Sequence, residues 1–171
     1  MRAQQRRIAS NFGRVRDSLP HNAPRTRCRS PVTLPSEPSL FTHALRVYWE
    51  DTDAGGVVFY ANYLKFFERA RTEWLRSLGH SQQRLRDETG AIFVVSDTSV
   101  RYLSPARLDD LLSVSVEPRE AGRATLVIAQ RAWRGDTLLA EGTIRIACVD
   151  AASLRPRRIP LTLPDHVIAV A

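Results

Sequence analysis

Three carboxylates fall within four residues of this chain, at Glu50, Asp51 and Asp53 in the stretch EDTDAGGVVFYANY. A pair of glycines and a short apolar run follow them. Carboxylates this close together could bind a metal ion, take part in phosphoryl transfer, act as nucleophile or general base, or simply form a turn. The residues around the cluster discriminate between these chemistries.

The spacing disfavours a metal site. A calcium-binding loop beginning at Asp51 would place Asp53 at its third position, but Gly55 and Asn62 would then occupy positions that need oxygen ligands. We therefore expect no metal and no cofactor. An Asp-x-Asp pair also begins some phosphatases, yet those require a parallel βαβ core, and no GxxxxGK[ST] phosphate loop is present.

Acyl transfer fits the surroundings of the cluster better. The apolar run after the glycines would keep water away, and a long helix is predicted directly after it. The first N–H groups of a helix lack partners within the helix and can polarise a carbonyl oxygen. One carboxylate beside such a donor is a minimal arrangement for acyl transfer. A purely structural turn remains the simple alternative.

The elements around the cluster follow from apolar periodicity. Alternation over residues 42–49 predicts a strand, and residues 61–78 show the spacing of a helix with one wide apolar stripe. Gly79 is placed to end that helix, and Arg69 and Glu73 could pair on its polar side. The stripe consists of Tyr63, Phe67, Ala70, Trp74 and Leu78.

The rest of the chain is rich in strands. After a short helical connection at 81–89, strands are predicted at 92–102, 111–118, 124–133 and 137–149, with turns between them. One long helix followed by an antiparallel meander indicates an α+β domain, in which the helix covers one face of a sheet of about five strands.

Charge divides the chain into two parts. The net charge is +7, but residues 1–40 hold eight arginines against two acids, while residues 41–171 hold seventeen basic residues against sixteen acids. We expect a basic, disordered N-terminal extension over 1–40 and one domain over 41–171. Because the domain is nearly neutral, nucleic-acid binding is not expected. A basic arm or a transit peptide are alternatives for the extension.

Composition also sets the expected compartment. The chain has no run of 18 apolar residues, so no membrane span is expected. Cys28 and Cys148 are the only cysteines and lie in unlike contexts, which disfavours a disulfide framework and suggests a reducing compartment. We therefore expect a cytoplasmic protein.

The stretch RVYWEDTDAGGVVFYANYLKFFERARTEWLRSLG closely resembles the signature of hotdog-fold acyl-CoA thioesterases of the 4-hydroxybenzoyl-CoA thioesterase-like family. Its pattern D-x-D-x-x-G-x-V-x-[FY]-x-x-Y is far more specific than an isolated Asp-x-Asp. FVVSDTSVRYLSPARLDD and LLAEGTIRIACVD resemble the bacterial branch associated with the Tol–Pal cluster. The resemblance covers about residues 42–160.

The resemblance implies a fold, an activity and site residues. The implied fold is a long central helix wrapped by a curved antiparallel sheet, in homodimers or homotetramers with active sites between subunits. The implied substrate is an acyl-CoA. The family's catalytic aspartate corresponds to Asp53, and its oxyanion donor to the backbone N–H of Tyr60, where several relatives carry His. Arg123 corresponds to a stretch that contacts CoA phosphates.

Structural roles are expected for two further residues, and two alternative functions stay open. Asp51 is expected to shape the turn and Tyr63 to lie in the core. One alternative function is a non-catalytic partner in cell-envelope (Tol–Pal) organisation. The other is a hotdog hydratase or dehydratase, which would need a histidine base in the active loop. The histidines, at positions 21, 43, 80 and 166, all lie outside that loop.

Overall fold

The computed structural model describes residues 40–163. The predicted extension over 1–40, apart from Leu40, and the last eight residues of the predicted domain, 164–171, lie outside the described residues. In order, the elements are β1 (Phe41–Arg46), the 3₁₀ turn η1 (Trp49–Asp51), α1 (Asn62–Ser77), α2 (Gln82–Thr89), β2 (Ala91–Tyr102), β3 (Leu111–Ala121), β4 (Thr125–Arg134) and β5 (Thr137–Asp150).

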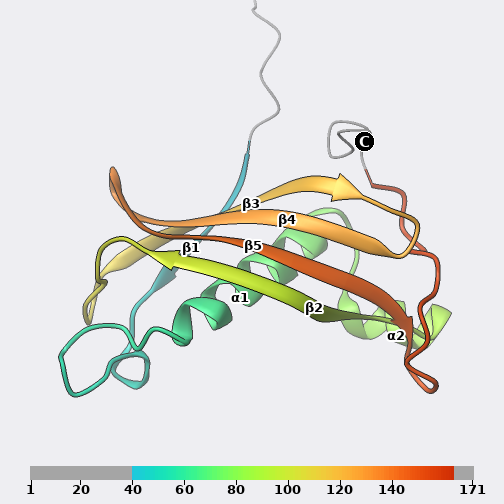
Figure 1. Ribbon diagram of the computed structural model, residues 1–171, viewed down its shortest axis with the longest axis horizontal. Coiled ribbons are helices and arrows are strands. Elements are labelled where there is room, and N and C mark those ends of the chain that lie inside the picture. The colour runs from blue at the N-terminus through green and yellow to red at the C-terminus, as the bar shows by residue number, and fades with distance from the viewer. Residues whose placement is uncertain (1–39, 164–171) are drawn as a thin grey trace, which may run out of the picture. The chain divides into compact units, whose positions relative to one another are not determined.

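The five strands form one antiparallel sheet in the order β1-β3-β4-β5-β2. Short turns join β3, β4 and β5 into a meander, β1 pairs with the free side of β3, and β2 pairs with the free side of β5. The sheet curves around α1, which runs along one of its faces (Figure 1). The predicted α+β hotdog fold is confirmed.

The core lies between α1 and the sheet. Phe66, Phe67 and Ala70 are completely buried on the inner face of the helix. They belong to one apolar cluster with Val114 of β3 and Ile144 of β5. Burying a phenylalanine side chain stabilises the fold by about 1.5–3 kcal/mol. This packing fixes the helix on the sheet and so determines where its N-terminus lies.

The first predicted strand is too long. β1 ends at Arg46, and Trp49 lies in η1 with 79% of its surface exposed. The reason is a local competition for hydrogen bonds, because the carboxylate of Asp51 accepts one from the Tyr48 N–H at 2.9 Å. This bond draws the chain into a turn although its alternating pattern continues to Trp49.

Two further details differ from the sequence-based expectation. Glu73 forms its ion pair with Arg76, and Arg69 lies over the Phe66 ring at 5.9 Å. The third strand continues past Pro118 to Ala121, with an irregularity in its register directly after that proline. A proline has no N–H to donate, so it is accommodated in a sheet at such irregularities.

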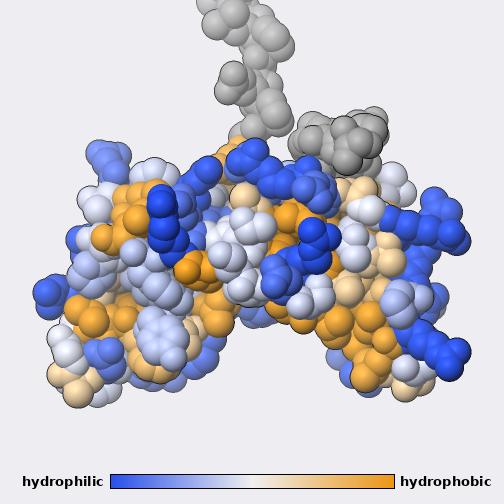
Figure 2. Space-filling view, in the orientation of Figure 1, coloured by the Kyte–Doolittle hydropathy of each residue, from blue (hydrophilic) through white to orange (hydrophobic). Residues whose placement is uncertain are grey.

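The surface of the described residues is mixed. Charged and apolar side chains alternate in small patches on the face shown in Figure 2. No helix within residues 40–163 is long and apolar enough to cross a membrane.

Candidate active site

Asp51 is a structural residue of the turn before α1. Only 2% of its surface is exposed, and its carboxylate Oδ2 accepts the hydrogen bond from the Tyr48 N–H. Its backbone carbonyl accepts hydrogen bonds from the Phe59 N–H and from Nδ2 of Asn62, both at 2.9 Å. Asp51 therefore shapes the turn, in agreement with the sequence-based interpretation.

Asp53 occupies the tip of the loop and is exposed. Its Oδ1 accepts a hydrogen bond of 2.8 Å from the Gly55 N–H. A side chain at Gly55 would crowd this oxygen, since a Cβ there would lie 3.1 Å from it, and Gly56 has a φ of +70°. The glycine pair thus permits the tight turn around the carboxylate. Within residues 40–163, Oδ2 of Asp53 accepts no hydrogen bond and stays open to a ligand.

The loop is closed like a hairpin and anchored to the segment between β2 and β3. Thr52 and Val58 form an antiparallel bridge, and the Asp53 N–H donates to the Val57 carbonyl at 2.9 Å. The Val58 N–H donates to the Ala106 carbonyl, also at 2.9 Å. Asp53 at the tip and Tyr60 on the returning arm consequently belong to one loop that is held in place just before α1.

Tyr60 lies two residues before α1, just ahead of the helix that the sequence predicts over 61–78. A hydrogen bond of 2.8 Å from the Asn62 N–H to the Phe59 carbonyl closes a β-turn, with Tyr60 at its second position. In the part of the chain that the structure describes, the Tyr60 N–H donates to no backbone or side-chain oxygen. It is therefore available as a donor, and the helix dipole behind it favours negative charge.

Aromatic rings pack against the side chain of Tyr60. The Tyr60 ring lies 4.5 Å from that of Phe59 and 6.3 Å from that of Tyr102. Tyr63 is buried in the core, as predicted, and its hydroxyl accepts a hydrogen bond of 3.1 Å from the Ala106 N–H. Burial raises the pKa of Tyr63. A shallow pocket opens here between the three tyrosines, Val58 and residues 103–105.

Asp110 supports this region and was not identified from the sequence. It accepts hydrogen bonds from the Arg107 N–H at 2.8 Å and from Nη1 of Arg134 at 2.7 Å. Burial acts to raise the pKa of Asp110, but these hydrogen bonds and the arginine charges outweigh it and hold the pKa below its ordinary value. The turn-forming sequence SPARLDD predicts the hydrogen bond between Asp110 and the Arg107 N–H. The contact with Arg134 comes from the sheet and has no signal in the local sequence.

The turn between β3 and β4, which contains Arg123, lies at the opposite end of the sheet from the loop before α1 (Figure 1). β3 begins at Leu111, opposite Arg46 of β1, and Arg123 follows its far end in the turn to β4. Eleven strand residues extend roughly 34 Å. One chain therefore does not bring Arg123 close to Asp53. Arg123 and Arg158 instead line a separate shallow pocket beside residues 159–163.

The three acids of the cluster Glu50, Asp51 and Asp53 lie in different environments. Glu50 is exposed, Asp51 is buried against the turn, and Asp53 is at the loop tip. Within the described range, no group of three or more His, Cys, Asp or Glu side chains is positioned to hold a metal ion. The acid that remains available for chemistry is Asp53, on the same loop as the open N–H of Tyr60.

Comparisons with known proteins agree with this geometry. The family model of the thioesterase superfamily matches residues 55–141, so its match begins just after Asp53 and includes Tyr60 and Arg123. The acyl-CoA thioesterase YbgC of Haemophilus influenzae is 48% identical over 120 residues, covering 70% of this chain and 88% of that protein. The acyl-CoA thioester hydrolase YbgC of Escherichia coli O157:H7 is 46% identical over 126 residues, covering 73% of this chain and 93% of that protein.

A solved structure extends the likeness to three dimensions. A probable thioesterase from Bartonella henselae superposes with a TM-score of 0.68 at 32% sequence identity. The superposition covers 71% of this chain and 100% of that one.

Proposed function

The chain belongs to the thioesterase superfamily, and we propose that it hydrolyses an acyl-CoA thioester to a free acid and CoA. The observation that carries this proposal is that one closed loop presents both the Asp53 carboxylate and the Tyr60 N–H. Both the carboxylate and the N–H retain hydrogen-bonding capacity that no residue in the described range uses. The activities named for the two similar YbgC proteins support the choice of substrate.

In the proposed mechanism, the thioester carbonyl oxygen accepts a hydrogen bond from the Tyr60 N–H. The dipole of α1 adds to the stabilisation of the negative charge that develops on this oxygen. Tyr60 contributes its backbone here, so the difference between Tyr and the His of several relatives leaves this role intact. Its ring, together with Tyr102, forms an aromatic wall beside the reacting group.

Asp53 supplies the second part of the mechanism. Its carboxylate either attacks the carbonyl carbon or removes a proton from the water that attacks it. In the first route a mixed anhydride forms, the C–S bond breaks, and water then hydrolyses the anhydride. In both routes one water is consumed, the acyl group leaves as an acid, and the sulfur takes a proton to become the CoA thiol.

The separation of Arg123 from Asp53 supports a homo-oligomer with shared sites. We propose that Asp53 of one subunit and Arg123 of its partner act on the same acyl-CoA, with the arginine near the CoA phosphates. The outer edge of β2 has no pairing strand among the described residues, and Val94 and Val95 on it are 37% and 53% exposed. A second copy that pairs there would cover both valines and remove an open sheet edge.

The test is release of free thiol from a panel of short-chain, long-chain and aromatic acyl-CoA compounds. Thiol release that requires Asp53 is the expected result. Consumption of an unsaturated acyl-CoA without thiol release would identify a hydratase instead. Inertness toward the whole panel would contradict the proposal and favour the non-catalytic role in the cell envelope.

A further inference from the structure

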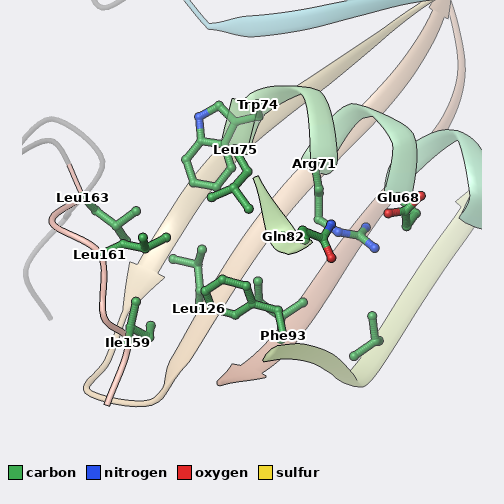
Figure 3. Close-up of a pocket in the computed structure, with 12 residues that line it drawn as sticks. Glu68, Arg71, Trp74, Leu75, Gln82, Phe93, Leu126, Ile159, Leu161 and Leu163 are labelled. Atoms are coloured by element: carbon green, nitrogen blue, oxygen red, sulfur yellow. The ribbon is translucent and has the colours of Figure 1, made fainter. Parts of the chain in front are cut away.

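A second cavity lies away from Asp53, beside the C-terminal half of α1 (Figure 3). Its volume is about 130 Å³, and α1, the first residue of α2, the β-sheet and residues 159–163 enclose it. Most of its wall is apolar. The main wall residues are Trp74, Leu75, Phe93, Leu126, Ile159 and Leu161.

The walls of the cavity are held by tertiary contacts. Trp74 and Leu126 are 7% and 4% exposed. The segment after β5 is fastened through its backbone, because the Ile159 N–H donates to the Arg123 carbonyl at 2.9 Å and the Arg157 N–H donates to the Cys148 carbonyl at 3.0 Å. The cavity is therefore formed before any ligand enters it.

One end of the cavity is polar and carries a cation. Nη1 of Arg71 donates a hydrogen bond of 2.7 Å to Oε1 of Gln130, which is fully buried and itself donates to the Phe67 carbonyl at 3.0 Å. This contact sets the direction of the guanidinium, which lies between Gln82 and Glu68 in Figure 3. A guanidinium has five N–H donors, so most of them remain available.

Arg71 forms no ion pair with any acid in residues 40–163. Burial lowers the pKa of Arg71, and the nearby charge of Glu68 opposes that effect only in part. Glu68 is exposed and accepts a hydrogen bond of 2.7 Å from the Thr72 hydroxyl. That hydroxyl also accepts one of 2.6 Å from Nε2 of Gln82. An anion would therefore meet Arg71 on the side away from Glu68.

We propose that this cavity binds a small carboxylic acid, with its apolar body between the walls and its carboxylate on Arg71. An apolar cavity of about 150 Å³ accommodates benzene, so the body should contain about six carbon atoms. Charge-assisted hydrogen bonds from a guanidinium to a carboxylate are among the strongest in proteins, which favours an acid over a neutral compound. Thioester hydrolysis would release acids of this class, but the inference does not depend on that activity.

Titration calorimetry on the full-length chain tests the recognition of charge, with hexanoate and hexanamide as probes. Hexanoate should bind more tightly than hexanamide. Arg71→Met should weaken the binding of hexanoate about 10- to 100-fold and leave the binding of hexanamide nearly unchanged. Arg71→Lys should retain part of the preference for hexanoate over hexanamide. Near-UV circular dichroism checks the fold, since Oε1 of Gln130 loses its donor in Arg71→Met. Equal affinity for the two probes, or no binding of hexanoate, would overturn the proposal.

A second set of variants locates the binding. Leu161→Trp should fill the cavity and abolish binding of both probes. The matched variant Leu111→Trp, at a position 55% exposed at the start of β3, should bind both normally. Asp53→Ala should also bind hexanoate normally, whether or not it hydrolyses thioesters. Binding that is lost in Asp53→Ala but kept in Leu161→Trp would place the acid at the Asp53 loop and refute this assignment.

Discussion

The side-chain amide of Asn62, the first residue of α1, donates a hydrogen bond of 2.9 Å to the backbone carbonyl of Asp51. Both residues are buried, with 5% and 2% of their surfaces exposed. The bond fastens the start of the central helix to the turn that leads into Asp53. The bond therefore fixes the two parts of the proposed site, the carboxylate loop and the N–H before the helix, relative to each other.

Asn62→Ala should lower the stability of the fold by removing this hydrogen bond. The Asp51 carbonyl keeps the bond from the Phe59 N–H but loses the side-chain donor, and removing such a buried partner costs about 1–3 kcal/mol in the free energy of unfolding. Urea unfolding measures the loss. Lys65→Ala, at an exposed position in the same helical turn, is the matched control and should change stability little. Equal stability of the Asn62→Ala variant and the wild type would show that the bond contributes nothing.

Asp53→Ala should reduce the rate of acyl-CoA hydrolysis by about 100- to 10,000-fold, the usual contribution of a positioned acid–base group. Its melting temperature should stay close to wild type, because the carboxylate is exposed and, among residues 40–163, bonds only to the Gly55 N–H. Glu50→Ala removes an exposed acid three residues away and should remain active. Wild-type hydrolysis by Asp53→Ala would exclude Asp53 from the chemistry.

Substitutions at Tyr60 separate its backbone from its side chain. Tyr60→Pro removes the N–H, and it suits the fold because proline is favoured at the second position of such a turn. It should lower kcat about 100- to 1,000-fold, the usual cost of losing one oxyanion donor. Tyr60→Phe keeps the N–H and should lose far less. If Tyr60→Phe were as damaging as Tyr60→Pro, the hydroxyl would be the important group.

Asp110 should make stability depend on acid pH. Its pKa is lower in the folded chain than in the unfolded one, so the charged carboxylate stabilises the fold above the ordinary aspartate pKa of about 4. This stabilisation is lost as the pH falls below that value through the lower folded pKa. Asp110→Asn should therefore be less stable than wild type at pH 7, and the difference should narrow at about pH 3.

Urea unfolding at the two pH values measures this effect. Asp136→Asn, an exposed acid in the β4–β5 turn, provides the control and should show no such convergence. A difference between Asp110→Asn and wild type that stays constant from neutral to acid pH would contradict the role of the Arg134 contact.

Mixing two inactive variants tests the shared site. Subunits carrying Asp53→Ala and subunits carrying Arg123→Glu should each hydrolyse acyl-CoA poorly. In a mixed dimer with shared sites, one site combines the intact Asp53 and the intact Arg123, so thiol release should recover after mixing. If both residues served one site within a single chain, every site would keep one defect and no activity would return.

The fold could be predicted because its signals are local. A helix repeats its apolar positions every three to four residues and a strand every two. Short windows of sequence therefore suffice to predict α1 and the meander. The glycine pair after Asp53 is similarly legible, since its role depends on neighbouring residues. At Trp49 the same reasoning fails, because the hydrogen bond between Asp51 and Tyr48 outweighs the alternating pattern.

The sequence by itself determined the element order, the turn around Asp53 and the resemblance that suggests thioester chemistry. Only the tertiary structure decided which distant residues meet. It placed Arg134 on Asp110, turned Arg71 toward Gln130 beside an apolar cavity, and separated Arg123 from Asp53 by the length of β3. These relationships depend on strand register, sheet curvature and the packing of α1. All three arise from contacts between residues far apart in the chain, so the local periodicity of the sequence does not predict them.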